Sequence, residues 1–157
     1  MRVFAMAMIL VASVWGGVAT AEKAGTNHYA LDGALEGRFG QAKCRLYFSK
    51  YGKNWTLQLV PENAYSPAAN LFFSPKFGNP APGSFPVQFA YRNSAASLGG
   101  SVSSDGATFS YETQGEVEFT RFDERVVGSF SFVAQDDDGA SVTAEGAFDC
   151  PRGEMLR

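Results

Sequence analysis

The sequence predicts an all-β protein: one domain, residues 31–150, folded as an antiparallel β-sandwich of about nine strands. Three observations predict this fold class. Apolar side chains recur at every second position in several short segments, and clusters of Gly, Pro, Asn and Asp separate these segments. Beyond residue 21, no segment shows the 3.6-residue period of an amphipathic helix.

The two ends of the chain are predicted to lie outside this domain. Residues 1–21 hold an early Arg2, an apolar run and the small residues Ala19-Thr20-Ala21, a pattern typical of a secretory signal peptide. Residues 22–30 are polar, small and without period, which predicts a flexible lead-in that carries the sole histidine, His28. Residues 151–157 are interpreted as a C-terminal tail.

A strand in residues 31–39 and a hairpin are expected next. Cys44, Leu46 and Phe48 share one face of a strand, residues 50–54 supply turn chemistry, and alternating apolar side chains resume from Trp55 to Leu59. Proline cannot donate to a sheet ladder, so Pro61 should end the second strand.

Residues 61–86 contain six prolines and are predicted to form a long irregular connection with at most one edge strand at residues 71–73. Long connections in compact domains are often functional. We therefore expect the contact residues of a binding site here, with a neighbour in the preceding hairpin turn. The alternative is that these aromatic side chains plug one end of the core. The candidates are Tyr65, Phe72, Phe73, Phe77 and Tyr51.

The remainder of the chain predicts further strands at residues 85–91, 101–103 and 107–111, followed by a three-stranded meander in residues 115–150. In the meander, alternate residues from Val126 to Ala134 and from Val142 to Cys150 are apolar or glycine, so each strand should bury one face. The run 136–139, Asp-Asp-Asp-Gly, has the composition of a hairpin turn.

The two cysteines, Cys44 and Cys150, are predicted to form a disulfide, because an exported chain meets an oxidising compartment. Such a bridge requires an early strand to lie beside or opposite the last strand. This linkage would also suit a closed sheet, so a small up-and-down, lipocalin-like β-barrel is the alternative to the sandwich. The proline-rich connection favours the sandwich, because it interrupts a simple up-and-down order.

Charge and residue types restrict the function. The net charge is −3, and the chain has no run of Lys and Arg, which argues against nucleic-acid binding and against stable membrane association after cleavage of the signal. One histidine and two bridged cysteines leave no base-activated nucleophile and no usual zinc site, so no catalytic residue, metal or cofactor is expected. We expect a non-enzymatic periplasmic or secreted domain that binds a protein or a small apolar or saccharide ligand. The alternative is an inhibitor of an exported hydrolase.

Several glycine-containing strand motifs also carry a family resemblance. They are Gly115-x-Val117-x-Phe119, Val126-x-Gly128-x-Phe130-x-Phe132, Asp138-Gly139, Val142, Gly146-x-Phe148 and the upstream Pro82-Gly83-Ser84-Phe85-Pro86-Val87. Together they resemble exported bacterial β-domain proteins of uncharacterised families. The resemblance implies a periplasmic or secreted setting and brings no established catalytic residues.

Overall fold

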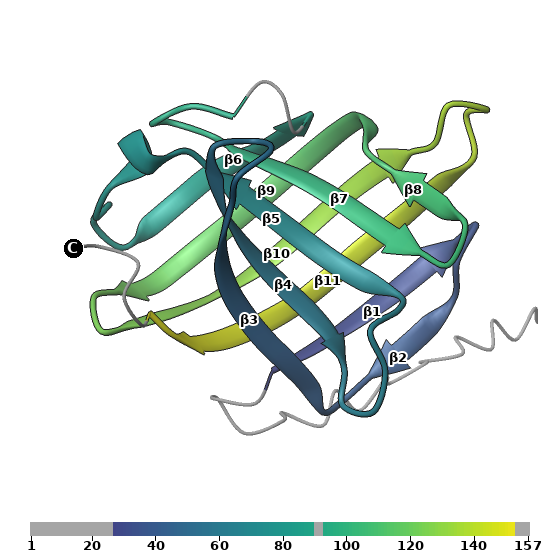
Figure 1. Cartoon of the computed structure of the whole chain (residues 1–157), viewed down its shortest axis with the longest axis horizontal. Helices are drawn as coiled ribbons and strands as arrows, with labels where there is room; N and C mark the ends of the chain where they lie inside the picture. Colours follow the sequence, from purple (N-terminus) through teal and green to yellow (C-terminus); the bar gives the residue numbers. More distant parts are fainter. Residues whose placement is uncertain (1–26, 90–92, 153–157) are drawn as a thin grey trace, which may run out of the picture.

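The computed structural model describes residues 27–89 and 93–152 and shows an all-β protein (Figure 1). The all-β prediction is confirmed. The described strands and a single turn of 3-10 helix, η1, follow one another along the chain as β1 (His28–Gly33), β2 (Gly37–Phe39), β3 (Ala42–Ser49), β4 (Asn54–Pro61), β5 (Ala68–Phe73), η1 (Pro75–Phe77), β6 (Gly83–Phe89), β7 (Leu98–Ser104), β8 (Ala107–Phe109), β9 (Tyr111–Phe122), β10 (Arg125–Gln135) and β11 (Ser141–Pro151).

These strands form one sheet that curls into a nearly closed barrel. Its order is β2-β1-β11-β10-β9-β6-β7-β5-β4-β3, and β8 pairs with β7 beside this path. In Figure 1, β3, β4, β5 and β7 lie in front and cross the directions of β9, β10, β11 and β1 behind them. Of the two predicted architectures, this arrangement fits the barrel. It is not a simple up-and-down barrel, because β6 and β7 pair in parallel.

The C-terminal meander forms as predicted. Strands β9, β10 and β11 are antiparallel neighbours, and the expected inward residues of β10, from Val126 to Ala134, face those of β11. The turn between β10 and β11 is fixed by Asp136, whose Oδ1 accepts hydrogen bonds from the amides of Asp138 and Ala140. Gly139 has φ 86°, the left-handed conformation that favours glycine.

The first hairpin, β3 and β4, also forms as predicted. Leu46 of β3 lies opposite Leu57 of β4, and Phe48 lies opposite Trp55. The Phe48 and Trp55 rings meet edge to face, with 5.5 Å between their centroids. Because Leu57 is in the core and Leu46 packs against it, the alternate residues of the same two strands point outward.

The structure corrects the prediction for residues 61–86. This segment contains β5, a central strand between β4 and β7, as well as η1 and the start of β6. No alternation marked β5 in the sequence, because residues on both of its faces are buried. Pro86 lies inside β6 without breaking the sheet: β6 pairs with β7 only from Val87 onward, so Pro86 has a ladder partner on the β9 side alone.

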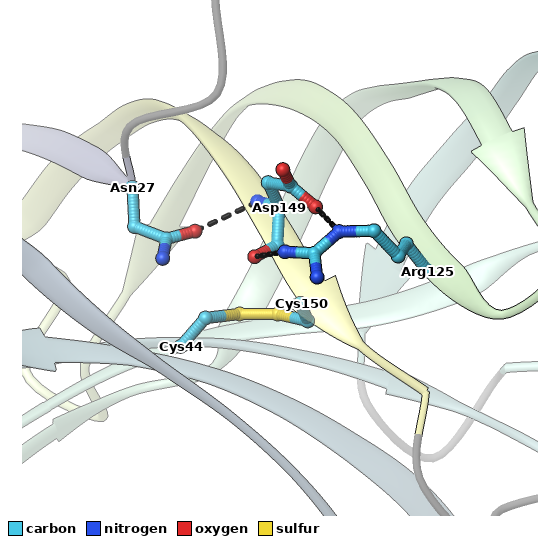
Figure 2. The surroundings of a disulfide bond; sticks show 5 residues. All are labelled: Asn27, Cys44, Arg125, Asp149 and Cys150. Atoms are coloured by element: carbon cyan, nitrogen blue, oxygen red, sulfur yellow. Dashed lines mark hydrogen bonds and ion pairs between the residues drawn. A yellow bond between two sulfur atoms is a disulfide. The ribbon is translucent and has the colours of Figure 1, made fainter.

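The predicted disulfide between Cys44 and Cys150 joins one edge strand of the sheet, β3, to β11, which lies two strands in from the other edge, β2. The two Cα atoms of the disulfide are 5.5 Å apart (Figure 2). Next to it, the Ala42 amide donates to the Asn27 carbonyl oxygen at 2.9 Å, and Asn27 Oδ1 accepts from the Asp149 amide at 2.7 Å. These contacts close the seam that the strand pairing leaves open.

One interior end of the barrel is packed with phenylalanine rings. Phe77 of η1 lies 5.1–6.0 Å, centroid to centroid, from the rings of Phe85, Phe73, Phe119 and Phe122. The other end is crossed by Tyr29 of β1, whose hydroxyl donates to the Pro67 carbonyl oxygen at 2.5 Å. The η1 turn therefore plugs this end of the barrel. For Phe77, this is the alternative in which the aromatic side chains of residues 61–86 plug one end of the core.

The ends of the domain differ slightly from the predicted boundaries. Strand β1 begins at His28, so residues 28–30 belong to the sheet and not to a lead-in, and β11 ends at Pro151. The predicted signal peptide, residues 1–21, lies outside the described residues. Within the part of the chain that is described, no helix has the length and apolar character needed to span a membrane.

Candidate binding surface

The outer side of β3, β4, β5 and β7 is the main candidate binding surface, and we call it the front face (Figure 1). Alternate residues of these strands, such as Leu57, Leu71 and Val102, are in the core, so their neighbours must point outward. Besides Gly99, the residues of the front face are Lys43, Arg45, Tyr47, Asn54, Thr56, Gln58, Val60, Ala68, Asn70, Phe72, Ser101 and Ser103.

Aromatic side chains mark one row of the front face. Tyr47 of β3, Thr56 of β4 and Phe72 of β5 are register partners, so Tyr47 and Phe72 flank Thr56. The Tyr47 side chain is 44% exposed, whereas Thr56 is 1% exposed. At the margin, Tyr65 from the β4–β5 turn is 76% exposed, and the Arg45 guanidinium carbon lies 4.6 Å from its ring centroid.

A row of polar side chains runs next to the aromatic row, and we call it the amide ladder. Gln58 Nε2 donates to Asn70 Oδ1 at 2.9 Å, and Asn70 Nδ2 is 3.3 Å from both Ser101 Oγ and Ser103 Oγ. The Asn70 amide thus uses its carbonyl oxygen and both N–H groups within the sheet. Its orientation is therefore fixed.

Within residues 27–89 and 93–152, two front-face oxygens have no hydrogen-bond partner. They are the buried Thr56 Oγ1 and Asn54 Oδ1, both on β4. An unpaired buried polar group costs free energy, about 1–3 kcal/mol in proteins. A ligand that supplied the missing partner would recover part of that cost.

Charge separates strongly between the two halves of the protein. Residues 37–104, which build the front face, carry seven Lys or Arg and a single carboxylate, that of Glu62. Residues 105–151 carry eleven Asp or Glu and two Arg. On the front face itself, Lys43 and Arg45 have no carboxylate partner among the described residues. The front face is therefore positive, although the protein as a whole is negative.

The predicted site residues fall into two groups. Phe73 and Phe77 are 1% and 5% exposed, so they belong to the core and cannot form a surface contact. Both point inward because they lie on the inner parity of β5 and in the η1 plug. Phe72 is half-buried on the front face, Tyr65 lies at its margin, and Tyr51 is fully exposed at the tip of the β3–β4 turn.

Sequence reasoning missed Tyr47, the amide ladder and the positive front face. Tyr47 alternates with Cys44, Leu46 and Phe48 in the printed sequence, and this spacing was enough to place it outward. The uneven distribution of charge between residues 37–104 and 105–151 is also present in the sequence. The net charge does not reveal it, because it sums both halves, and the basic residues are too scattered to form a Lys/Arg run. Asn70 could not be recognised, because its strand was interpreted as part of a loop.

The opposite side of the barrel has a shallow trough over β1, β2, β10 and β11, lined by both polar and apolar side chains. Two adjoining depressions, about 540 and 770 Å³, share Ala30, Arg38 and Glu145 in their linings. His28 lines the larger depression and Asp32 the smaller. No group of three His, Cys, Asp or Glu side chains within the described residues could hold a metal ion.

The shifted pKa values belong to the ends of the barrel and not to the front face. Burial raises the pKa of Tyr29 far above its usual value of 10.0, and burial lowers the pKa of Arg152, which lies over the Phe122 ring. A hydrogen bond from Arg121 lowers the pKa of the exposed Asp123 carboxyl. The front face itself holds aromatic, amide, hydroxyl and cationic groups and no carboxylate, which suits binding more than acid–base chemistry.

Comparison with known proteins identifies no relative: the chain matches no family model, no curated protein and no solved structure.

Proposed function

We propose that this protein is a non-enzymatic binding domain of the periplasm or extracellular space, and that it holds its ligand on the front face. Export is supported by the signal-like residues 1–21 and by the disulfide between Cys44 and Cys150, which suits an oxidising compartment. The ligand is a protein or a small apolar or saccharide molecule.

The observation that carries this proposal is the combination of two aromatic rings, the exposed Tyr47 and the half-buried Phe72, with a preorganised amide ladder on one sheet face. Tyr47 and Phe72 offer flat apolar surface, and Asn70 is held rigidly between Gln58 and the serines of β7. Rigid polar groups bind with a smaller loss of conformational entropy than mobile ones. Binding on the outside also fits the packing of the barrel, because phenylalanine rings occupy one end of the interior.

The alternative, an inhibitor of an exported hydrolase, rested on residues 61–86 as a rigid protruding loop. Most of that segment is β5, η1 and the start of β6, and Phe73 and Phe77 are buried. No observation of the described residues therefore favours inhibition over other kinds of binding.

A ligand screen tests the proposal. The oxidised protein would be titrated by NMR with a panel of neutral and charged sugars, small apolar compounds and short peptides. We expect binding compounds whose affinity falls at least tenfold in the double variant Tyr47→Ala/Phe72→Ala. The matched control is Tyr111→Ala, because Tyr111 is an exposed tyrosine on β9, outside the front face. Compounds that bind the double variant as well as the wild type would refute a front-face site, and turnover of any compound would refute a purely binding role.

A further inference from the structure

We infer that the ligand of the front face is an acidic saccharide, a glycan chain that carries carboxylates, with its sugar rings against Tyr47 and Phe72. This inference rests on the proposed function and specifies the class of ligand. It follows from three properties of the front face: its aromatic spacing, its hydrogen-bonding groups and its charge.

The aromatic spacing suits an oligosaccharide. Tyr47 and Phe72 lie on β3 and β5, with β4 between them. Neighbouring strands are about 4.7–4.9 Å apart, so the two side chains are separated by about 9–10 Å, which is comparable with the length of a disaccharide. The C–H faces of pyranose rings pack on aromatic rings, because an aromatic face is electron-rich and apolar. One sugar chain could then contact both the aromatic row and the amide ladder beside it.

The hydrogen-bonding groups suit hydroxyls. The amide ladder presents the partly exposed Gln58 and Ser103 next to the aromatic row, and the buried Asn70 and Ser101 hold them from below. Thr56 Oγ1 is buried between Tyr47 and Phe72 and has no partner in the described part of the chain, so a ligand hydroxyl that moved between the two rings would supply one. The centre of a protein–protein interface is usually apolar or aromatic. A row of amides and hydroxyls at the centre of the face therefore favours a sugar over a protein.

The charge suits an acidic chain. Lys43 and Arg45 project from the same side of β3, and Lys50 and Lys53 lie in the turn that follows. No carboxylate occurs between Glu36 and Glu62, so nothing on this hairpin neutralises the four cations locally. Arg45 is also braced by its contact with the Tyr65 ring, which limits its freedom before binding. Carboxylates spaced along a glycan would pair with these four cations, and the acidic side chains of residues 105–151 would repel the glycan from the other half of the barrel.

The test compares matched ligands on the intact, disulfide-bonded protein. The probe is an oligogalacturonate of defined length, titrated by calorimetry at low and at physiological ionic strength. Its methyl ester keeps the sugar rings and removes the charges. Poly-glutamate supplies carboxylates without sugar, and single-stranded DNA supplies anionic charge with aromatic bases. We expect oligogalacturonate to bind at least tenfold more tightly than each of the other three, and to bind more weakly as salt is added.

Variants locate the contacts. Tyr47→Ala and Arg45→Gln should each weaken oligogalacturonate binding about tenfold. The controls Tyr111→Ala and Arg121→Gln remove an exposed tyrosine and an exposed arginine from the other half of the barrel and should leave affinity within about twofold of the wild type. Melting temperatures would show that every variant is folded.

Three results would overturn this inference. Equal or tighter binding of poly-glutamate or of single-stranded DNA would mean that charge alone, or a different polymer, is recognised. Oligogalacturonate affinity that is unchanged in both Tyr47→Ala and Arg45→Gln would place any site elsewhere. Equal binding of the methyl ester, with the Tyr47→Ala effect retained, would overturn the acidic specificity but leave the proposed front-face binding function intact.

Discussion

Removing the Phe77 side chain tests the assignment of the η1 turn as a plug of the barrel. Phe77 is 5% exposed, and four phenylalanine rings surround it. Truncating a buried phenylalanine to alanine costs about 3–5 kcal/mol, because apolar surface is lost and a cavity remains. Four tilted or edge-to-face ring contacts place Phe77→Ala near the upper half of that range. A loss of about 4 kcal/mol in a domain of this size should lower the melting temperature by about 10–20 °C.

Phe72→Ala is the matched control, because it makes the same chemical change five residues earlier. Phe72 lies on the outer face of β5 and is only half-buried, so we expect a loss of about 1 kcal/mol and a shift of a few degrees. Thermal unfolding followed by circular dichroism, with urea unfolding at 25 °C, measures both variants. Equal destabilisation by Phe72→Ala and Phe77→Ala would refute the plug.

Three further predictions concern the seam and the two ends of the barrel. Cys44→Ala removes the bridge to Cys150 and should lower the unfolding free energy in urea by about 2–5 kcal/mol; an unchanged midpoint would contradict this. Folding raises the pKa of Tyr29, so the stability linked to its protonated hydroxyl is fully present below pH 10 and is lost as the pH rises further. The free energy of unfolding should therefore fall less steeply above pH 10 in Tyr29→Phe than in the wild type. The pKa of Asp123, measured by carboxyl NMR, should lie below its usual value and increase in Arg121→Gln, and the stability linked to Asp123 should be lost as the pH falls through the lowered pKa.

The C-terminal half of the fold could be predicted because its strands obey simple rules. Each strand of the meander has one buried face, so alternation and turn residues such as Gly139 define its length, its direction and its neighbours. The disulfide could be predicted from the expected export of the chain and from its two cysteines. Sequence alternation could not reveal that the sheet curls into one barrel, because closure depends on which distant strands meet.

The least predictable segment was residues 61–86. Strand β5 is buried on both faces, so the alternation that reveals a half-exposed strand is absent from it. The surrounding prolines then suggested a loop. In the structure, however, Pro61 ends β4, Pro75 begins η1, and Pro86 lies within β6 with a ladder partner on the β9 side alone. Part of the candidate site was missed for the same reason. The hydrogen bonds of Asn70 to Gln58 and Ser101 can be expected only if Asn70 lies on a strand between theirs.

The most direct test of the account is an NMR map of where an acidic oligosaccharide binds. Backbone amide shifts of the oxidised protein would be recorded during titration with oligogalacturonate. We predict that the largest changes fall on β3, β4, β5 and β7, centred on Tyr47, Gln58 and Phe72, with little change on β10 or β11. Changes centred on the trough around Glu145, or no saturable change at all, would contradict a front-face site.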